Sequence, residues 1–272
     1  MSRIARNRRP MTLTEFLNGL DVQRHVIGAL ILRELHTRFG RNNIGFLWFL
    51  GEPLLLGGAV GIMHSGSGNH GAIDLQPIPL AMIGYVGFMM FRSIAQRAQS
   101  TLISNQPLLY HRFVTIFDML FARAVLDFCA AVATMAILLF ALWLSGHGNL
   151  PARPIIVAAA ILLLWWWSFS LSLLLCSLCH ASHLAERLLH PVMYLMMPIS
   201  GCFFALQWIP EPYRSWLYWF PMVQMFELLR YGQFYSLDDR YVDLPYLIAW
   251  CLSLTFAGLA TVRVTRRYVH LS

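Results

Sequence analysis

Lysine is missing from this sequence of 272 residues, and charged residues of any kind are scarce. All 20 basic residues are arginine, so the chain can supply neither a Schiff-base lysine nor the lysine of a Walker-type phosphate loop. Charged residues make up 12% of the chain and hydrophobic residues 58%, whereas an ordinary soluble domain has about 25% charged residues. This composition excludes a disordered chain and argues strongly against a soluble enzyme. It predicts an all-α integral membrane protein.

Cysteine is also scarce, and its placement is informative. The five Cys residues lie in or beside apolar runs, and their number is odd. Both features favour buried thiols over a disulfide framework. The positions are Cys129, Cys176, Cys179, Cys202 and Cys251. The first stretch of the chain is Arg-rich and too polar for the apolar core of a cleavable signal, so none is expected.

Long apolar runs are abundant, and six of them approach the roughly 20 residues that a membrane-spanning helix needs. The expected spans are Ile44–Met63, Ile78–Ile94, Val125–Leu144, Ile155–Cys179, Leu188–Gln207 and Leu244–Val262. They make a transmembrane domain over 44–272, preceded by an N-terminal arm over 1–43. Cytoplasmic loops of membrane proteins are enriched in basic residues. Placing the N-terminus inside puts sixteen of the 20 arginines on the inner side, which predicts that both termini are cytoplasmic.

The N-terminal arm contains a predicted basic amphipathic helix. Thr12 and Glu15 match a capping box, and apolar residues then recur at helical spacing beside Arg24, Arg33 and Arg38. Such a helix is suited to the inner membrane interface, with its apolar face in lipid and its arginines at the headgroups. The alternative is that the apolar stripe packs on protein.

The stretch 208–243 is crowded with aromatic residues and is interrupted by Pro210, Pro212 and Pro221. Its apolar part is too short for a seventh span. We expect short periplasmic re-entrant helices, because Trp and Tyr rings at a membrane interface bury an apolar body and keep one edge wet. The rings could also stack on sugar, and a plain aromatic belt is the alternative.

Two motifs match known cofactor sites in residue type and spacing, but their expected structural surroundings do not fit those sites. Gly66, Gly68 and Gly71 have the dinucleotide-binding spacing, but that motif needs a preceding strand and a following helix. Residues 176–180 fit a c-type haem attachment pattern, yet the charge rule puts them at the inner end of the fourth span. Two thiols one helical turn apart are ordinary core residues. We therefore expect no cofactor in this chain.

Ionisable residues at membrane depth are more informative. Glu52 and Asp127 fall within expected spans, where a carboxylate usually faces the bundle interior. We favour structural ion pairing for both, with a proton or substrate contact as the alternative. The loop after the fourth span has a further group whose spacing matches no standard zinc signature, so no metal site is expected. That group is His180, His183, Glu186 and His190.

Three stretches carry a family resemblance. The first is Leu32–Gly40, which continues through Gly45–Trp48 to Glu52 and Pro53. The second is Asn105, Gln106, Leu109 and Tyr110, with Asp118, Ala122 and Arg123. The third is Ile209 and Pro210, Trp219–Pro221, and Glu227–Arg230. Together with six spans, these stretches resemble the membrane subunit of capsular-polysaccharide ABC exporters, in the wider type-two ABC permease group.

The resemblance implies a homodimer with a cavity between two six-span halves, paired with two copies of a separate ATPase subunit that binds ATP and Mg. It implies a cytoplasmic coupling helix at about 100–112, seated in a groove of the ATPase. The implied contact residues are Asn105, Gln106, Leu109, Tyr110 and Arg112. The implied cargo is lipid-linked capsular polysaccharide, which crosses the bacterial inner membrane from the cytoplasm to a periplasmic co-polymerase or export protein. No nucleic-acid partner is expected.

Physical chemistry indicates which residues would meet such a cargo. A long polar glycan needs a protein-lined path through hydrocarbon, and guanidinium groups pair with anionic groups of a polymer or its anchor. We expect Arg33, Arg38 and Arg41 to bind the anionic anchor near the inner mouth. Binding of these arginines to anionic membrane lipid is an equally supported alternative. The outer exit is expected at Trp208, Trp216, Tyr218, Trp219 and Tyr231.

Two other functions remain open. A permease of the same architecture could carry O-antigen, a lipid or a drug. A membrane-embedded transferase acting on lipid-linked sugars would need an acid or base with a metal or nucleophile in a cleft. The sequence offers no convincing set of this kind, so we expect a permease subunit and not an enzyme.

Overall fold

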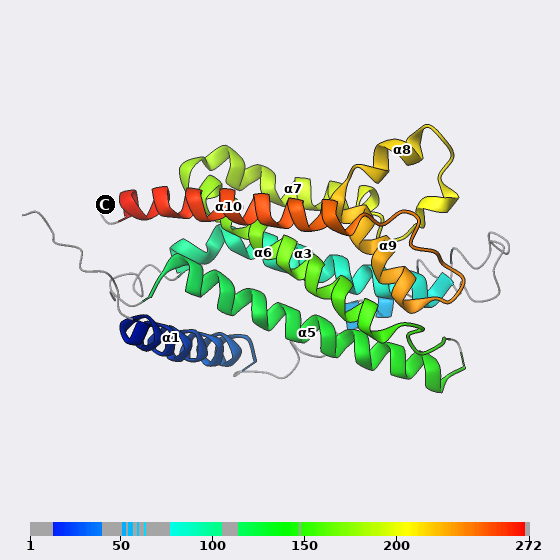
Figure 1. Ribbon diagram of the computed structural model, residues 1–272, viewed down its shortest axis with the longest axis horizontal. Coiled ribbons are helices and arrows are strands. Elements are labelled where there is room, and N and C mark those ends of the chain that lie inside the picture. Colours follow the sequence, from blue (N-terminus) through cyan, green and yellow to red (C-terminus); the bar gives the residue numbers. More distant parts are fainter. Residues whose placement is uncertain are drawn as a thin grey trace, which may run out of the picture.

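A computed structural model describes residues 13–39, 77–104, 114–146 and 148–269, together with a few positions between 51 and 63. Every regular element within these residues is a helix (Figure 1), which confirms the all-α prediction. The helices are α1 (Leu13–Phe39), α3 (Pro77–Ser104), α5 (Ile116–Leu144), α6 (Pro154–Ala181), α7 (His183–Ile199), the 3-10 helix η1 (Leu206–Trp208), α8 (Tyr213–Tyr218), α9 (Pro221–Gln233) and α10 (Leu244–Val269).

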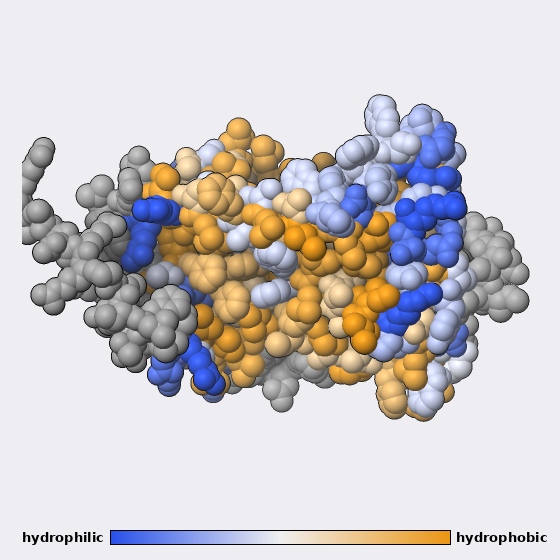
Figure 2. All heavy atoms as spheres, viewed as in Figure 1, coloured by the Kyte–Doolittle hydropathy of each residue, from blue (hydrophilic) through white to orange (hydrophobic). Residues whose placement is uncertain are grey.

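Four of the described helices are long and apolar enough to cross a membrane. Their apolar segments are Pro77–Leu102, Ile116–Leu144, Pro154–Ala181 and Leu244–Arg266. These segments contain the second, third, fourth and sixth expected spans. Most of the first expected span, 44–63, lies outside the described residues. Figure 2 shows apolar residues across the middle of the visible face and hydrophilic residues gathered at its two ends, as a membrane-embedded bundle requires.

The expectation of one continuous span over 188–207 is wrong in its second half. α7 begins at His183 and ends at Ile199. The chain then turns at Gly201, whose φ of +83° lies in the left-handed region that favours glycine. This turn aims the Gly201 carbonyl group at the side chain of Arg230 on α9.

α3 lies at the centre of the bundle. In an 18-residue apolar stretch of α3, 83% of the residues are buried, against 22% in the corresponding stretch of α10. α3 packs against α5, α6, α7 and α9, and a Cβ atom on Gly84 would collide with the carbonyl group of Cys202. α10 packs mainly on α6 and keeps an exposed apolar face, which lipid can cover.

Aromatic rings join α5 to α6. The rings of Phe117 and Phe121 meet that of Phe169 edge-on, with centroids 5.4 and 5.5 Å apart. Trp165 on α6 donates its Nε1–H to the carbonyl of Ala124 on α5 at 2.9 Å. Edge-to-face pairs add about 0.5–1.5 kcal/mol each beyond area burial, so the first turns of α5 are held firmly against α6.

The cysteine prediction is confirmed at four of the five positions. All five thiols are free, and all except Cys129 are buried. Cys129 is exposed because it lies on the side of α5 that faces outward, and an apolar run in a membrane helix has such a side. Cys176 and Cys179 are core residues of α6 one turn apart.

Candidate functional site

Buried polar side chains gather at the two opposite ends of the long helices. At one end, α1 packs against α5, and Arg123 of α5 reaches Thr101 in the last turn of α3. At the other end, α9 meets the beginnings of α3 and α6. We call the first group the arm network (Gln23, Glu34, Thr101, Asp118 and Arg123) and the second group the α9 lock (Arg153, Gln224, Glu227, Arg230 and Gln233).

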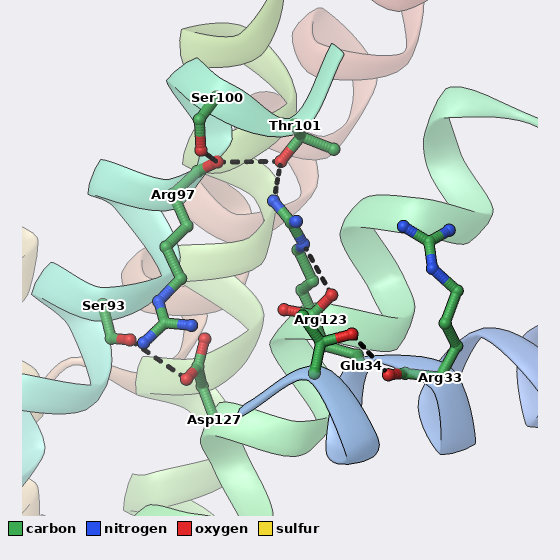
Figure 3. A network of polar contacts seen from close by, with 9 residues as sticks. Arg33, Glu34, Ser93, Arg97, Ser100, Thr101, Arg123 and Asp127 are labelled. Atoms are coloured by element: carbon green, nitrogen blue, oxygen red, sulfur yellow. Dashed lines mark hydrogen bonds and ion pairs between the residues drawn. The ribbon is translucent and has the colours of Figure 1, made fainter. Parts of the chain in front are cut away.

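Arg123 on α5 is the centre of the arm network (Figure 3). Its Nε atom lies 3.3 Å from Glu34 Oε2 on α1, and its side chain donates a 2.9 Å hydrogen bond to Thr101 Oγ1 on α3. The Glu34 and Arg123 side chains are only 14% and 15% exposed. One guanidinium group therefore connects three helices, and solvent screens the ion pair only weakly.

A second contact ties α1 to the first turn of α5. Gln23 Nε2 donates to Asp118 Oδ1 at 2.9 Å. Asp118 is buried, and with Thr115 it forms a capping box that starts α5. Its Oδ2 atom accepts the backbone N–H of Thr115 at 3.0 Å. The same carboxylate therefore caps α5 and holds α1.

Asp127, one helical turn beyond Arg123 on α5, is fully buried. Its Oδ1 atom accepts a hydrogen bond from Ser93 Oγ at 3.0 Å. Figure 3 shows the guanidinium group of Arg97, on α3, directed at the Asp127 carboxylate. These side chains extend the polar region from the arm network toward the middle of the bundle.

Glu52 has the partner that a structural ion pair requires. Its Oε1 atom lies 3.0 Å from Arg92 NH2 and accepts a 3.0 Å hydrogen bond from the Tyr85 hydroxyl group. The Arg92 guanidinium carbon lies 5.3 Å from the ring centre of Tyr194 on α7. The expected ion pairing is therefore observed for Glu52, and it connects α3 to two other segments.

The α9 lock is built on Glu227 and Arg230, whose side chains are 6% and 2% exposed. Glu227 Oε1 accepts from Arg230 NH1 and from the backbone N–H of Leu206, both at 2.9 Å. Arg230 also donates to the Gly201 carbonyl group. Burial lowers the pKa of the Arg230 guanidinium, and the charge of Glu227 opposes that shift.

Gln224 and Arg153 extend the α9 lock to its neighbours. Gln224 donates to the carbonyl of Tyr218 at 2.8 Å and accepts from the backbone N–H of Asp243 at 3.0 Å, so it joins α8, α9 and the start of α10. Arg153 NH1 donates to the carbonyl of Tyr231 at 2.7 Å, and its guanidinium carbon lies 4.1 Å from the centre of that ring. Tyr231, expected at the exit, is thus a half-buried partner of Arg153.

The other expected exit residues differ in exposure. Trp216 and Trp219 are 78% and 68% exposed, whereas Trp208 packs against the small cluster around Leu80. Tyr218 is half-buried and meets Trp219 edge-on. Only Trp216 and Trp219 among these residues present broad free ring surface.

Two aromatic residues that the sequence did not single out complete this surface. The Tyr246 ring lies 6.0 Å from Trp219 and 6.3 Å from Trp250, edge-on to both. Its hydroxyl group donates to the carbonyl of Trp219 at 2.6 Å. The spacing of four between Tyr246 and Trp250 on one helix was the available signal.

Of the residues expected at the inner mouth and at the ATPase contact, only Arg33 has a described side chain. Arg33 is exposed on α1, and Figure 3 shows its side chain directed away from the Glu34–Arg123 pair. Arg38 also lies on α1, but its side chain is outside the described part. The remaining residues outside the description are Arg41, Asn105, Gln106, Leu109, Tyr110 and Arg112.

Comparison with known proteins gives a consistent result. Residues 25–234 match the family described as ABC-2 type transporter. The capsule polysaccharide export inner-membrane protein CtrC of Neisseria meningitidis serogroup A is 34% identical over 249 residues, which cover 92% of this chain and 94% of CtrC. BexB of Haemophilus influenzae, of the same description, is 32% identical over 92% of this chain and 94% of its own. The polysialic acid transport protein KpsM of Escherichia coli is 30% identical over 90% and 95%.

Proposed function

This chain belongs to the ABC-2 type transporter family, and from that premise we propose that it is the transmembrane subunit of an ATP-driven exporter of lipid-linked capsular polysaccharide. The observation that carries the proposal is the shared description of its relatives, which it matches over nine-tenths of both lengths. The long apolar helices and polar ends of the bundle suit a chain held in the inner membrane.

ATP hydrolysis belongs, in this proposal, to a separate subunit that binds ATP and Mg. The lysine-free sequence cannot supply the lysine that reaches the β- and γ-phosphates in a Walker-type site. We propose two copies of this chain and two copies of the ATPase, with the segment 100–112 of each chain seated on an ATPase subunit. Polysaccharide then passes to a periplasmic co-polymerase or export protein.

The proposed topology has six spans with both termini in the cytoplasm. The α1 end of the bundle is then cytoplasmic and the α9 end periplasmic. α7 serves as the fifth span although it has only 17 residues, and the short helices α8 and α9 re-enter the outer interface. The arginine distribution supports this orientation.

The proposed cargo path begins at Arg33, Arg38 and Arg41 and ends at the exposed rings on α8 and directly after it. Arginine pairs bidentately with carboxylate or phosphate groups, so it suits an anionic polymer or its anchor. Exposed rings bind sugar faces without demanding one sequence of sugars. Trp216 and Trp219 are the most exposed rings of the expected exit set.

Deletion of the gene for this chain tests the cargo. We expect capsular polysaccharide to accumulate in the cytoplasm, and a plasmid copy of the chain to restore surface polysaccharide. Normal capsule together with loss of O-antigen, lipid or drug export would favour one of the other cargoes. Turnover of a lipid-linked sugar by the purified chain alone would favour a transferase and contradict the proposal.

Co-purification tests whether a separate subunit hydrolyses ATP. A tagged copy of the chain is expected to carry a second protein with a Walker motif, in a one-to-one ratio. Charge reversal at Arg112, or deletion of 106–110, is expected to leave the chain in the membrane and to uncouple ATP hydrolysis from export. Normal export by these variants would show that the coupling assignment is wrong.

A further inference from the structure

The Glu34–Arg123 pair joins two of the three stretches that carry the family resemblance. Glu34 lies in the stretch 32–40, and Arg123 closes the stretch that begins at Asn105. These stretches are far apart in sequence, yet Arg123 Nε and Glu34 Oε2 are 3.3 Å apart. Neither residue has a role in the cargo path or at the ATPase contact proposed above.

The contacts of the arm network lie beside the two helix ends that the chain between α3 and α5 connects. Thr101 lies in the last turn of α3, which ends at Ser104, and Asp118 lies in the first turn of α5, which begins at Ile116. Arg123 reaches Thr101 directly and Glu34 on α1, while Gln23 on α1 reaches Asp118. α1 is therefore fastened to the first turns of α5 at two points, and Arg123 carries the connection on to the last turn of α3.

The geometry of α1 fits a rigid brace. Gln23 and Glu34 are eleven residues apart, which is close to three full turns of an α-helix and about 16 Å along its axis. They consequently lie on the same face of α1. A single helix thus spans both contacts with α5, so motion of this end of α5 is passed to α1 as a rigid body, and Arg123 includes the end of α3 in the same unit.

The contacts are side chain to side chain, and each depends on chemistry that substitution can remove selectively. The Glu34–Arg123 pair is mostly shielded from solvent, so its attraction is screened less than that of a surface pair. Thr101 Oγ1 accepts from Arg123 while donating to the carbonyl of Arg97 at 2.8 Å. The network joins the three helices through side chains, so removing one group can release α1 without altering the backbone of any helix.

We propose that Arg123 is a positioning residue that makes α1 move together with the facing ends of α3 and α5 when the ATPase works. This inference rests on the proposed function, because it assigns the transmission of ATPase motion to particular residues of the same machine. In consequence α1, with its exposed Arg24 and Arg33, shifts against the membrane surface in each cycle. Without the Arg123 contacts, ATP is hydrolysed but α1, which carries the cargo-path residue Arg33, does not move with α3 and α5.

The test uses the complex of this chain with its ATPase subunit, reconstituted in vesicles with lipid-linked polysaccharide. The measured quantity is polysaccharide exported per ATP hydrolysed. For Arg123→Gln and Glu34→Gln we expect this ratio to fall about fivefold or more, which is the lower end of typical coupling factors. Co-purification of the ATPase should remain at the wild-type level. The double variant Glu34→Arg with Arg123→Glu should recover much of the ratio, because it restores the ion pair in reverse.

Matched substitutions separate positioning from folding. Thr101→Val loses the acceptor for Arg123 and should lower the ratio, whereas Thr101→Ser keeps the hydroxyl group and should not. Gln23→Glu places like charges together at Asp118 and should lower the ratio, whereas Gln23→Arg keeps a donor and should not. Arg187→Gln, an exposed arginine near the same end of the bundle, is the control for loss of positive charge.

The outcomes are distinct. An unchanged ratio in Arg123→Gln, Thr101→Val and Gln23→Glu, with wild-type export intact, overturns the inference alone. A uniform loss of assembled complex in all the variants, including the serine and arginine replacements, also overturns it, because the network would then serve only folding. Absence of polysaccharide export by the wild-type complex overturns the proposed function and this inference together.

Discussion

The arm network and the α9 lock use similar residues in different ways. In the α9 lock, Glu227 and Arg230 are three residues apart on one helix, and their further partners are backbone groups of Leu206 and Gly201. In the arm network, Glu34 and Arg123 lie on separate helices and bond side chain to side chain. The backbone partners fix the α9 end in one arrangement, whereas side-chain partners on separate helices join elements that can move as one unit.

The difference also appears in burial. The Arg230 side chain is 2% exposed, against 15% for Arg123. A deeply buried ion pair cannot lose one member without leaving an unpaired charge in a low dielectric. We therefore assign the α9 lock to holding the α9 end rigid and the arm network to movement, and the following predictions test that assignment.

Removal of one charge from the α9 lock should have the largest effect on stability. Glu227→Ala leaves Arg230 buried without its carboxylate, which costs about 3–5 kcal/mol in comparable buried pairs. We expect little folded chain in the membrane and a sharply lower unfolding temperature in detergent. The double variant Glu227→Leu with Arg230→Met is the control and should be closer to wild type. Equal loss in the single and double variants would contradict this account.

A smaller effect is expected at the turn that meets the lock. Gly201→Ala places a Cβ atom at a φ of +83°, and the left-handed conformation costs an L-residue about 1–2 kcal/mol. The Val223 side chain would also be crowded, at 3.2 Å from the new Cβ. The unfolding temperature should fall by less than in Glu227→Ala. Gly146 also has a positive φ, but the space around it is open. Gly146→Ala therefore measures the free-energy cost of the backbone conformation alone.

Loss of the arm pair should affect stability less still. Arg123→Gln removes a partly shielded ion pair but keeps a side chain that can hydrogen bond, so we expect a loss of about 1 kcal/mol or less. A thermal melt of the purified chain measures it. A loss as large as that of Glu227→Ala would mean that the arm network is a second static lock, and the contrast between the two ends would disappear.

The sequence predicted the membrane-embedded, all-helical class and four of the spans because apolar runs of that length have few other uses. It did not predict the end of α7 at Ile199, since Pro198 and the positive φ of Gly201 interrupt a run that hydropathy alone reads as continuous. Contacts between distant stretches, such as Glu34 with Arg123, depend on helix packing, which no local pattern encodes. The alternative that α1 packs on protein is supported by its contacts with α5.

The exposed rings at the α9 end should show the smallest effect on stability and a clear effect on export. Trp216 and Trp219 are 78% and 68% exposed, so replacing both with Ala removes little packing, although Trp219 also touches Tyr246. We expect unfolding within about 0.5 kcal/mol of wild type for Trp216→Ala, and a fall in surface polysaccharide for the double variant that exceeds the fall in membrane-inserted chain. Phe256→Ala is the matched control, because that ring is 79% exposed on the apolar face of α10. A drop in inserted chain equal to the drop in export would assign the rings to an aromatic belt and leave the polysaccharide exit elsewhere.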